Sequence, residues 1–222
     1  MSDIDNIAPE RPLIVPLGDS ALLVRFGSRL DDAANAAALS LARALEDDPV
    51  AGLVEMVPSL VSVLLIYDPA KAEPVRLAGE ISLRLSRPSR HAAASHRIAV
   101  QFGGADGPDL DAVAASLNLS VATFIEQHCA APLRVLATGF APGFVDCGFH
   151  PDHLTLPRRK QVRPLVPAGS VLFAAGQTAI TATDIPTGWH VIGRTEFRNF
   201  DAARLPPTQL KAGDMVSFEA LR

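Results

Sequence analysis

The chain is short of cysteine, and this narrows the class of protein that it can belong to. Its two cysteines, Cys129 and Cys147, are too few for a disulfide framework and form no Cys-x-x-Cys pair. A reduced, cytoplasmic compartment is therefore expected. Residues 1–6 are polar and acidic, so they do not resemble a secretory signal.

Long apolar runs and strong positive charge are also missing. The longest apolar run, near residues 61–67, is much shorter than the roughly 18 residues that a spanning helix needs. The net charge is −4 and no basic stripe is present, so neither a membrane nor a nucleic acid is an expected partner. Apolar residues make up 48% of the chain, which is enough to build a folded core.

The usual catalytic signatures are absent as well. The sequence contains no Gly-x-x-x-x-Gly-Lys-Ser/Thr phosphate loop, no Gly-x-Ser-x-Gly elbow and no His-Glu-x-x-His pair. These absences argue against a nucleotide site in this chain and against a familiar hydrolase that acts alone.

Apolar patterns divide the chain into two parts. Strands are predicted at residues 21–26, 54–57 and 61–67, and helices at 31–46 and 72–86, where apolar residues recur at helical spacing. This order predicts a small α+β domain over residues 1–90, with its helices on one face of an antiparallel sheet. The polar, aperiodic residues 86–96 are the predicted linker.

Residues 97–222 predict a second, β-rich domain. A strand at residues 97–102 is followed by two short helices, for which Asp109 and Ser120 are the predicted N-caps. From Pro132 onward, short apolar runs alternate with glycine and proline, which is typical of a β-sandwich or barrel. The fold class expected for the whole chain is therefore α+β and rich in β-strands.

A rigid loop at residues 139–144 is the first candidate site. Phe140, Pro142 and Gly143 lie in a run of two glycines, a proline and two phenylalanines. One interpretation is a tight corner whose phenylalanines fill the core. The other is a pocket wall, because glycine allows a ligand to approach the backbone.

A group of arginines follows, before a turn that ends at Ser170. Arg158, Arg159 and Arg163 can clamp a carboxylate or a phosphate through paired hydrogen bonds. Ion pairs on a solvated loop and contacts with a partner protein are the alternatives.

Further polar candidates are His128, Gln177, Thr178 and Arg194. The two residues Gln177 and Arg194 lie beside glycines and offer directional hydrogen bonds, so either can orient a substrate. His128 ends a predicted helix, where it interacts with free carbonyls, and it is also a candidate for proton transfer. The single tryptophan, Trp189, is expected in the core.

Three residues, Cys147, His150 and His153, are spaced like zinc ligands. Closed structural zinc sites usually take four protein ligands from two segments. No metal site is therefore predicted.

Taken in order, these elements resemble the KipI / PxpB family, whose members are known as the B component of 5-oxoprolinase or as allophanate hydrolase subunit 1. The family's backbone framework recurs in six segments, at residues 139–144, 157–159, 166–171, 176–178, 188–189 and 192–195. The resemblance implies a cyclophilin-like β-barrel after a smaller α+β domain. It also implies a substrate site that includes Phe140, Pro142, Gly143, Arg158, Arg159, Ser170, Gln177, Thr178 and Arg194.

The resemblance further implies that the chain is one member of a complex. KipA-like and LamB/YcsF-like proteins are the implied partners, and the complex opens 5-oxo-L-proline to L-glutamate with ATP hydrolysis. No cofactor is expected on this chain itself. Two alternatives are a carboxyltransferase component of a biotin-dependent urea carboxylase and a KipI-like histidine kinase inhibitor. Asp146, Thr181 and Thr187 depart from the family's usual residues.

Overall fold

The computed structural model describes residues 12–85 and 93–221. The chain forms two compact units, residues 1–92 and 93–222, which are described separately. Residues 86–92 of the predicted linker lie outside the described residues. Its last two residues, Ser95 and His96, belong to a strand, because they pair with Met215 and Val216.

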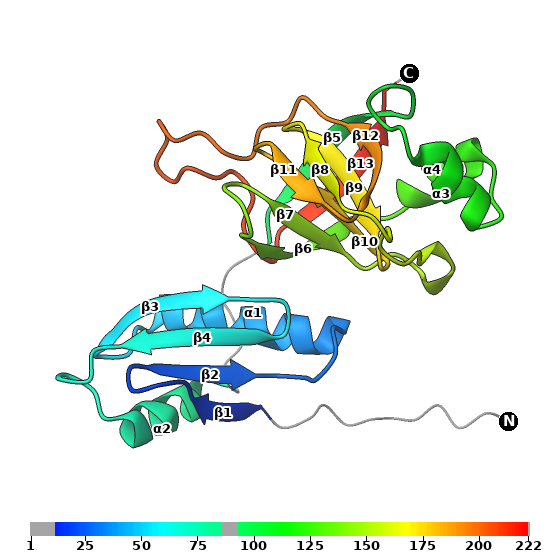
Figure 1. Ribbon diagram of the computed structural model, residues 1–222. Coiled ribbons are helices and arrows are strands. Elements are labelled where there is room, and N and C mark those ends of the chain that lie inside the picture. The colour runs from blue at the N-terminus through cyan, green and yellow to red at the C-terminus, as the bar shows by residue number, and fades with distance from the viewer. Residues whose placement is uncertain (1–11, 86–92, 222) are drawn as a thin grey trace, which may run out of the picture. The chain divides into compact units, whose positions relative to one another are not determined.

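The first unit contains a four-stranded antiparallel sheet and two helices (Figure 1). The strands are β1 (Leu13–Pro16), β2 (Ala21–Arg25), β3 (Leu53–Pro58) and β4 (Ser62–Tyr67), in the sheet order β1-β2-β4-β3. The helices are α1 (Asp32–Asp47) and α2 (Pro74–Arg84). This arrangement confirms the predicted α+β class, and it adds the strand β1, which the sequence did not indicate.

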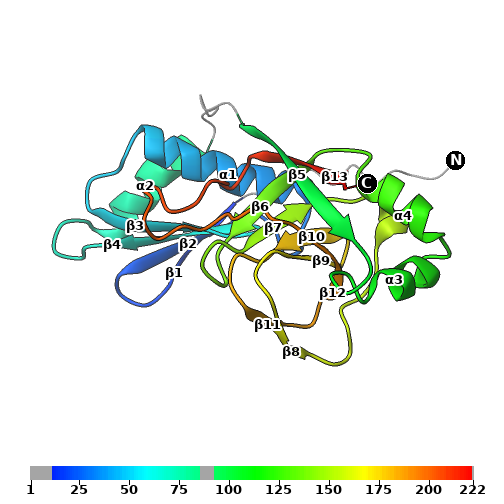
Figure 2. The same cartoon turned by 90° about the horizontal axis from the view of Figure 1, so that it is seen from above.

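Both helices cover one face of this sheet, as Figure 2 shows. Alternate residues of the two central strands, among them Val24, Val63 and Leu65, point toward the helices and are fully buried. The helix α1 begins where Asp31 accepts a hydrogen bond of 2.8 Å from the Ala34 N–H.

The second unit is built around a closed β-barrel. Within the described residues, its seven strands run in the order β10-β7-β6-β13-β5-β12-β9. Their bounds are β5 (Ser95–Phe102), β6 (Leu133–Thr138), β7 (Val145–Gly148), β9 (Ser170–Ala174), β10 (Gln177–Ile180), β12 (His190–Arg194) and β13 (Met215–Ala220). The expected β-barrel is thereby confirmed.

Parallel pairing between β5 and β13 joins the first and last strands of the barrel. The two helices α3 (Leu110–Ser116) and α4 (Val121–His128) lie side by side at one end of it (Figure 1, Figure 2). The pair β8 (Arg163–Val166) and β11 (Ile185–Thr187) forms a separate small sheet, and the short 3-10 helix η1 covers Asp152–Leu154.

The two predicted N-caps behave differently. Ser120 caps α4 as expected, accepting a hydrogen bond of 3.1 Å from the Thr123 N–H. The prediction for Asp109 was wrong, because its side chain makes no capping bond to α3. Its carboxylate is instead held by two arginines and a strand N–H, described below.

No helix among the described residues is both long and apolar enough to cross a lipid bilayer.

Candidate functional site

A pocket outside the barrel wall contains the best candidate site. Its volume is about 230 Å³. Strand β7, the loop at residues 139–144 and the β11–β12 segment supply its walls, together with one arginine. The lining residues are Phe140, Phe144, Asp146, Arg158, Ile185, Pro186, Thr187, Gly188 and Trp189.

The alternation of side chains along β7 places Asp146 in this pocket. Val145 and Cys147 point into the barrel core, so the residue between them must point outward. Its neighbours across the sheet are Ala137 on β6 and Ala179 on β10, whose small side chains leave space beside the carboxyl group. Asp146 is therefore a single carboxyl group on an otherwise apolar strand.

The pKa of Asp146 is unusual for an aspartate. Burial raises it from 3.8 to about 6, and the positive charge of Arg158 only partly offsets this effect. A carboxyl group with such a pKa changes protonation close to neutral pH, which is typical of groups that bind or transfer protons at functional sites.

Aromatic side chains supply the apolar walls of the pocket. Phe140 stands at the edge with 79% of its surface exposed, and its ring lies 5.4 Å from the Phe144 ring in an edge-on arrangement. Trp189 lies opposite, with the Arg158 guanidinium 5.4 Å from the centre of its ring. Phe140 has a positive φ of 73°, a conformation that is rare for a residue with a side chain.

The loop geometry explains the glycine at position 143. Gly143 has a φ of +69°, and a Cβ atom there would lie 2.5 Å from the Cβ of Phe200. Close packing against the segment near residue 200 therefore requires glycine, and this packing holds the Phe140–Phe144 loop in place.

The neighbouring arginines have a different role. Arg159 and Arg163 donate hydrogen bonds of 2.5 Å and 3.0 Å to one carboxylate oxygen of Asp109. The other oxygen accepts a bond of 2.8 Å from the Val191 N–H. Burial raises the pKa of Asp109, but the Val191 bond and the two guanidinium groups outweigh it and leave the pKa below 3.8. The structure thus uses Arg159 to join β8 and its approach to the barrel, whereas Arg158 faces the pocket.

A second polar group lies inside the barrel. The Nε2 atoms of His128 and His150 each lie 2.8 Å from the Thr178 hydroxyl oxygen. Because one hydroxyl carries one proton, one imidazole accepts a hydrogen bond from Thr178 while the other donates one to it. The two rings are 4.7 Å apart, and His128 also contacts Phe102 and Phe218.

Both imidazoles of this His-Thr-His group are neutral at physiological pH. Burial lowers the pKa of His150 to about 4. Burial, and next the nearby His150, lower the pKa of His128 well below 6.5. Thr178 is completely buried and His128 is 1% exposed, so this group ties α4 to the barrel and does not line the pocket.

The remaining candidates from the sequence lie elsewhere in the barrel unit. Ser170 is buried and donates a hydrogen bond of 2.7 Å to the Pro167 carbonyl within a turn. Gln177 lies on β10 and is 4% exposed, and Arg194 ends β12 with its guanidinium 3.8 Å from the Asp106 carboxylate. None of the three lines the pocket, and their predicted role in substrate binding stays a prediction.

The residues once considered as zinc ligands are separated by the fold. Cys147 is inside the barrel, His150 bonds to Thr178, and the exposed His153 contacts the Gln127 side chain at 3.1 Å. Across the part of the chain that the structure describes, no three histidine, cysteine or acidic side chains gather in a metal-binding arrangement.

The structure therefore brings Phe140 and Arg158 together, and it adds Asp146 and Trp189. From the sequence, Asp146 was only a departure from a family pattern and Trp189 was expected in the core. An acidic residue between Val145 and Cys147, in a stretch that can form a strand, was the available signal for a pocket carboxyl group.

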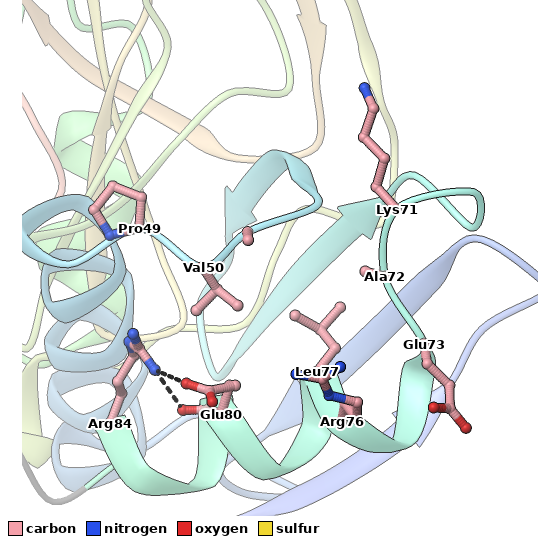
Figure 3. A pocket seen from close by; sticks show the side chains of 10 residues that line it. Pro49, Val50, Lys71, Ala72, Glu73, Arg76, Leu77, Glu80 and Arg84 are labelled. Carbon is pink, nitrogen blue, oxygen red and sulfur yellow. Dashed lines mark hydrogen bonds and ion pairs between the residues drawn. The ribbon is translucent and has the colours of Figure 1, made fainter.

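Another hollow, of about 290 Å³, lies in the first unit along α2 (Figure 3). Its most buried cation, Arg84, is neutralised by Glu80 at 2.8 Å and by Asp48 at 2.9 Å. Figure 3 shows Arg84 directed at Glu80, while Lys71 extends away from the hollow. Since the buried charge is already paired, we regard the Asp146 pocket as the stronger candidate.

Known proteins of similar sequence cover nearly the whole chain. A Bacillus subtilis protein, named as the B component of 5-oxoprolinase, is 34% identical over 92% of this chain and 91% of its own length. An Escherichia coli O157:H7 protein of the same name is 35% identical over 91% of this chain and 93% of its own length.

Solved structures show the same architecture. The crystal structure of TTHA0988 matches 91% of this chain with a TM-score of 0.80 and 34% identity, and the matched region spans 40% of that longer chain. Kluyveromyces lactis urea carboxylase matches 95% of this chain and 22% of its own, with a TM-score of 0.71 and 17% identity, which shows a shared fold.

The family described as "Carboxyltransferase domain, subdomain C and D" matches residues 12–210. Together with the two bacterial relatives, this match agrees with the predicted resemblance. The chain belongs to this carboxyltransferase-domain family, within which it is a KipI / PxpB-type protein.

Proposed function

We propose that this chain is the B component of a 5-oxoprolinase-type complex, which opens 5-oxo-L-proline to L-glutamate with ATP hydrolysis. The observation that carries the proposal is the similarity to two proteins that are named as this component, at 34% and 35% identity over nine-tenths of each chain. The pocket around Asp146 and Arg158 supports it, because a site of about 230 Å³ suits a small molecule.

Partner proteins are part of this proposal. The relatives are named as one component of an enzyme, which implies that others exist. The sequence of this chain has no phosphate loop, so ATP is assigned to a partner. We assign the partner roles to one KipA-like protein and one LamB/YcsF-like protein.

Reconstitution tests this function directly. The chain is co-expressed with the KipA-like and LamB/YcsF-like proteins of its own host, and glutamate release from 5-oxo-L-proline is measured with and without ATP. ATP-dependent glutamate formation that requires all three proteins is the expected result. A purified three-part complex that forms no glutamate would refute the proposal.

The family description favours one second candidate, a carboxyltransferase component of a biotin-dependent enzyme. Transfer of a carboxyl group from a biotinylated carrier protein to urea, in the presence of this chain and its partners, is the discriminating assay. Absence of transfer together with active lactam opening would exclude it. The kinase-inhibitor alternative stays a prediction, which no feature of the pocket favours.

A further inference from the structure

The shape of the Asp146 pocket indicates the size and character of its ligand. Ligand sites for drug-sized molecules usually occupy about 300–1,000 Å³. This pocket, at about 230 Å³, is smaller, and Phe140, Phe144 and Trp189 supply aromatic walls. A small ring with apolar faces fits such walls, because it replaces water on the aromatic surfaces.

Arg158 supplies the positive charge in the pocket. Its guanidinium lies over the Trp189 ring and, among the described residues, makes no hydrogen bond or ion pair. The adjacent Arg159, in contrast, is held by Asp109 at 2.5 Å. Arg158 is therefore available for an anion, and a guanidinium matches a carboxylate through two parallel hydrogen bonds.

Asp146 supplies a group that can both donate and accept a hydrogen bond. Of the titratable groups near it, Arg158 faces it across the pocket, whereas the Cys147 thiol points into the barrel. The flanking residues on β6 and β10 are the alanines 137 and 179, which carry no charge. With its pKa raised to about 6, the carboxyl group is substantially protonated in weakly acidic solution.

A lactam has the complementary edge. Its amide is held cis by the ring, so the N–H donor and the C=O acceptor point to the same side. A protonated carboxyl group presents one donor and one acceptor in the reverse order, whereas an ionised one can only accept.

We propose that this pocket binds a small carboxylic acid whose ring contains an amide, with Arg158 at the ligand carboxylate and Asp146 at the amide edge. This inference rests on the proposed function for the identity of the ligand, 5-oxo-L-proline. It goes further by assigning the ligand to this chain and each of its polar groups to one side chain.

Trp189 makes the pocket directly observable, because it is the only tryptophan of the chain and lines the pocket. The purified full-length chain is titrated with 5-oxo-L-proline, while tryptophan fluorescence and binding heat are followed. A saturable response with both methods is expected. The response to 2-pyrrolidinone, which lacks the carboxylate, and to L-proline, which lacks the lactam carbonyl, is expected to be weaker by about 10-fold or more.

Substitutions separate the two polar roles. Arg158→Gln is expected to weaken 5-oxo-L-proline binding by about 10-fold to 100-fold and to leave 2-pyrrolidinone binding unchanged. Asp146→Asn keeps a donor and an acceptor at every pH. Wild-type binding is expected to weaken as pH rises from 5 to 8, and this dependence is expected to vanish in Asp146→Asn. The matched control is Arg204→Gln, whose side chain pairs with Asp201 outside the pocket.

The outcomes for the pocket and for the complex are distinct. If the chain shows no saturable response, and Arg158→Gln leaves kcat/KM of the assembled complex unchanged, the pocket assignment is overturned even though lactam opening stands. A pH dependence that persists in Asp146→Asn overturns the role of Asp146. Binding by the chain without turnover by the complex supports the pocket and refutes the proposed reaction.

Discussion

Replacement of Asp146 by asparagine is expected to stabilise the barrel unit at pH 8 and to lose this effect in acid. The carboxyl group has a pKa of about 6 in the folded chain and 3.8 in the reference state. A folded-state pKa that is raised means that ionisation opposes folding above pH 6 and has no effect on stability below the reference value. The amide of asparagine carries no charge to desolvate.

The pKa difference sets the size of this effect. A shift of about two units corresponds to about 3 kcal/mol at 1.36 kcal/mol per unit. Asp146 retains some contact with solvent. We therefore treat about 3 kcal/mol as an upper bound on the gain in the free energy of unfolding at pH 8.

An opposing titration makes the comparison sharper. The pKa of His150 falls from 6.5 to about 4, so its contribution to stability is complete above pH 6.5 and is lost as pH falls toward 4. This loss also amounts to about 3 kcal/mol, and His128 acts in the same direction. In the wild type, the gain from protonating Asp146 offsets part of it. Asp146→Asn therefore loses stability more steeply between pH 7 and pH 4.5.

Urea denaturation followed by Trp189 fluorescence measures this effect in the barrel unit, which contains the only tryptophan. The matched control is Glu126→Gln, an exposed carboxylate on α4, for which a change below about 0.5 kcal/mol is expected. An Asp146→Asn variant no more stable than the wild type at pH 8, or equally stabilised at pH 8 and pH 4.5, would contradict the reasoning.

Two further substitutions test the polar contacts of the barrel. Thr178→Val keeps the side-chain shape but removes the hydroxyl that bridges two imidazoles, and it is expected to lower the free energy of unfolding by about 2–4 kcal/mol. Thr123→Val, at an exposed hydroxyl pair, is its control, and an equal loss in both would refute the bridge. Asp109→Asn weakens the attachment of Arg159 and Arg163 and is expected to cost about 1–3 kcal/mol at pH 7 by urea denaturation. Unchanged stability would show that these ion pairs are dispensable.

Local patterns of the sequence were sufficient for most of the helices and for the longer strands. The alanine-rich residues of α1 begin at Asp31, and the alternation along β4 is visible in the residues themselves. These features depend on neighbours within a few positions, such as the bond from the Ala34 N–H to Asp31. The order of motifs also predicted the family and, through it, the barrel.

The short strands could not be predicted in this way. The strands β1, β7, β8 and β11 contain only three or four residues each, too few to show a period. They are strands because another segment supplies hydrogen-bond partners, as β10 and β6 do for β7. The closing of the barrel likewise depends on the parallel pairing of β5 with β13, its first and last strands.

The family, the α+β class and two of the pocket residues, Phe140 and Arg158, followed from the residues and their order. The roles of the remaining polar groups depend on the folded arrangement. Asp109 looked like a helix cap, but Arg159 lies 50 positions away in the chain and 2.5 Å away in space. Asp146 looked like a substitution, but the sheet buries it beside an aromatic wall and raises its pKa to about 6. Burial and long-range contacts set the charge of a side chain, and neither can be read from its neighbours in the sequence.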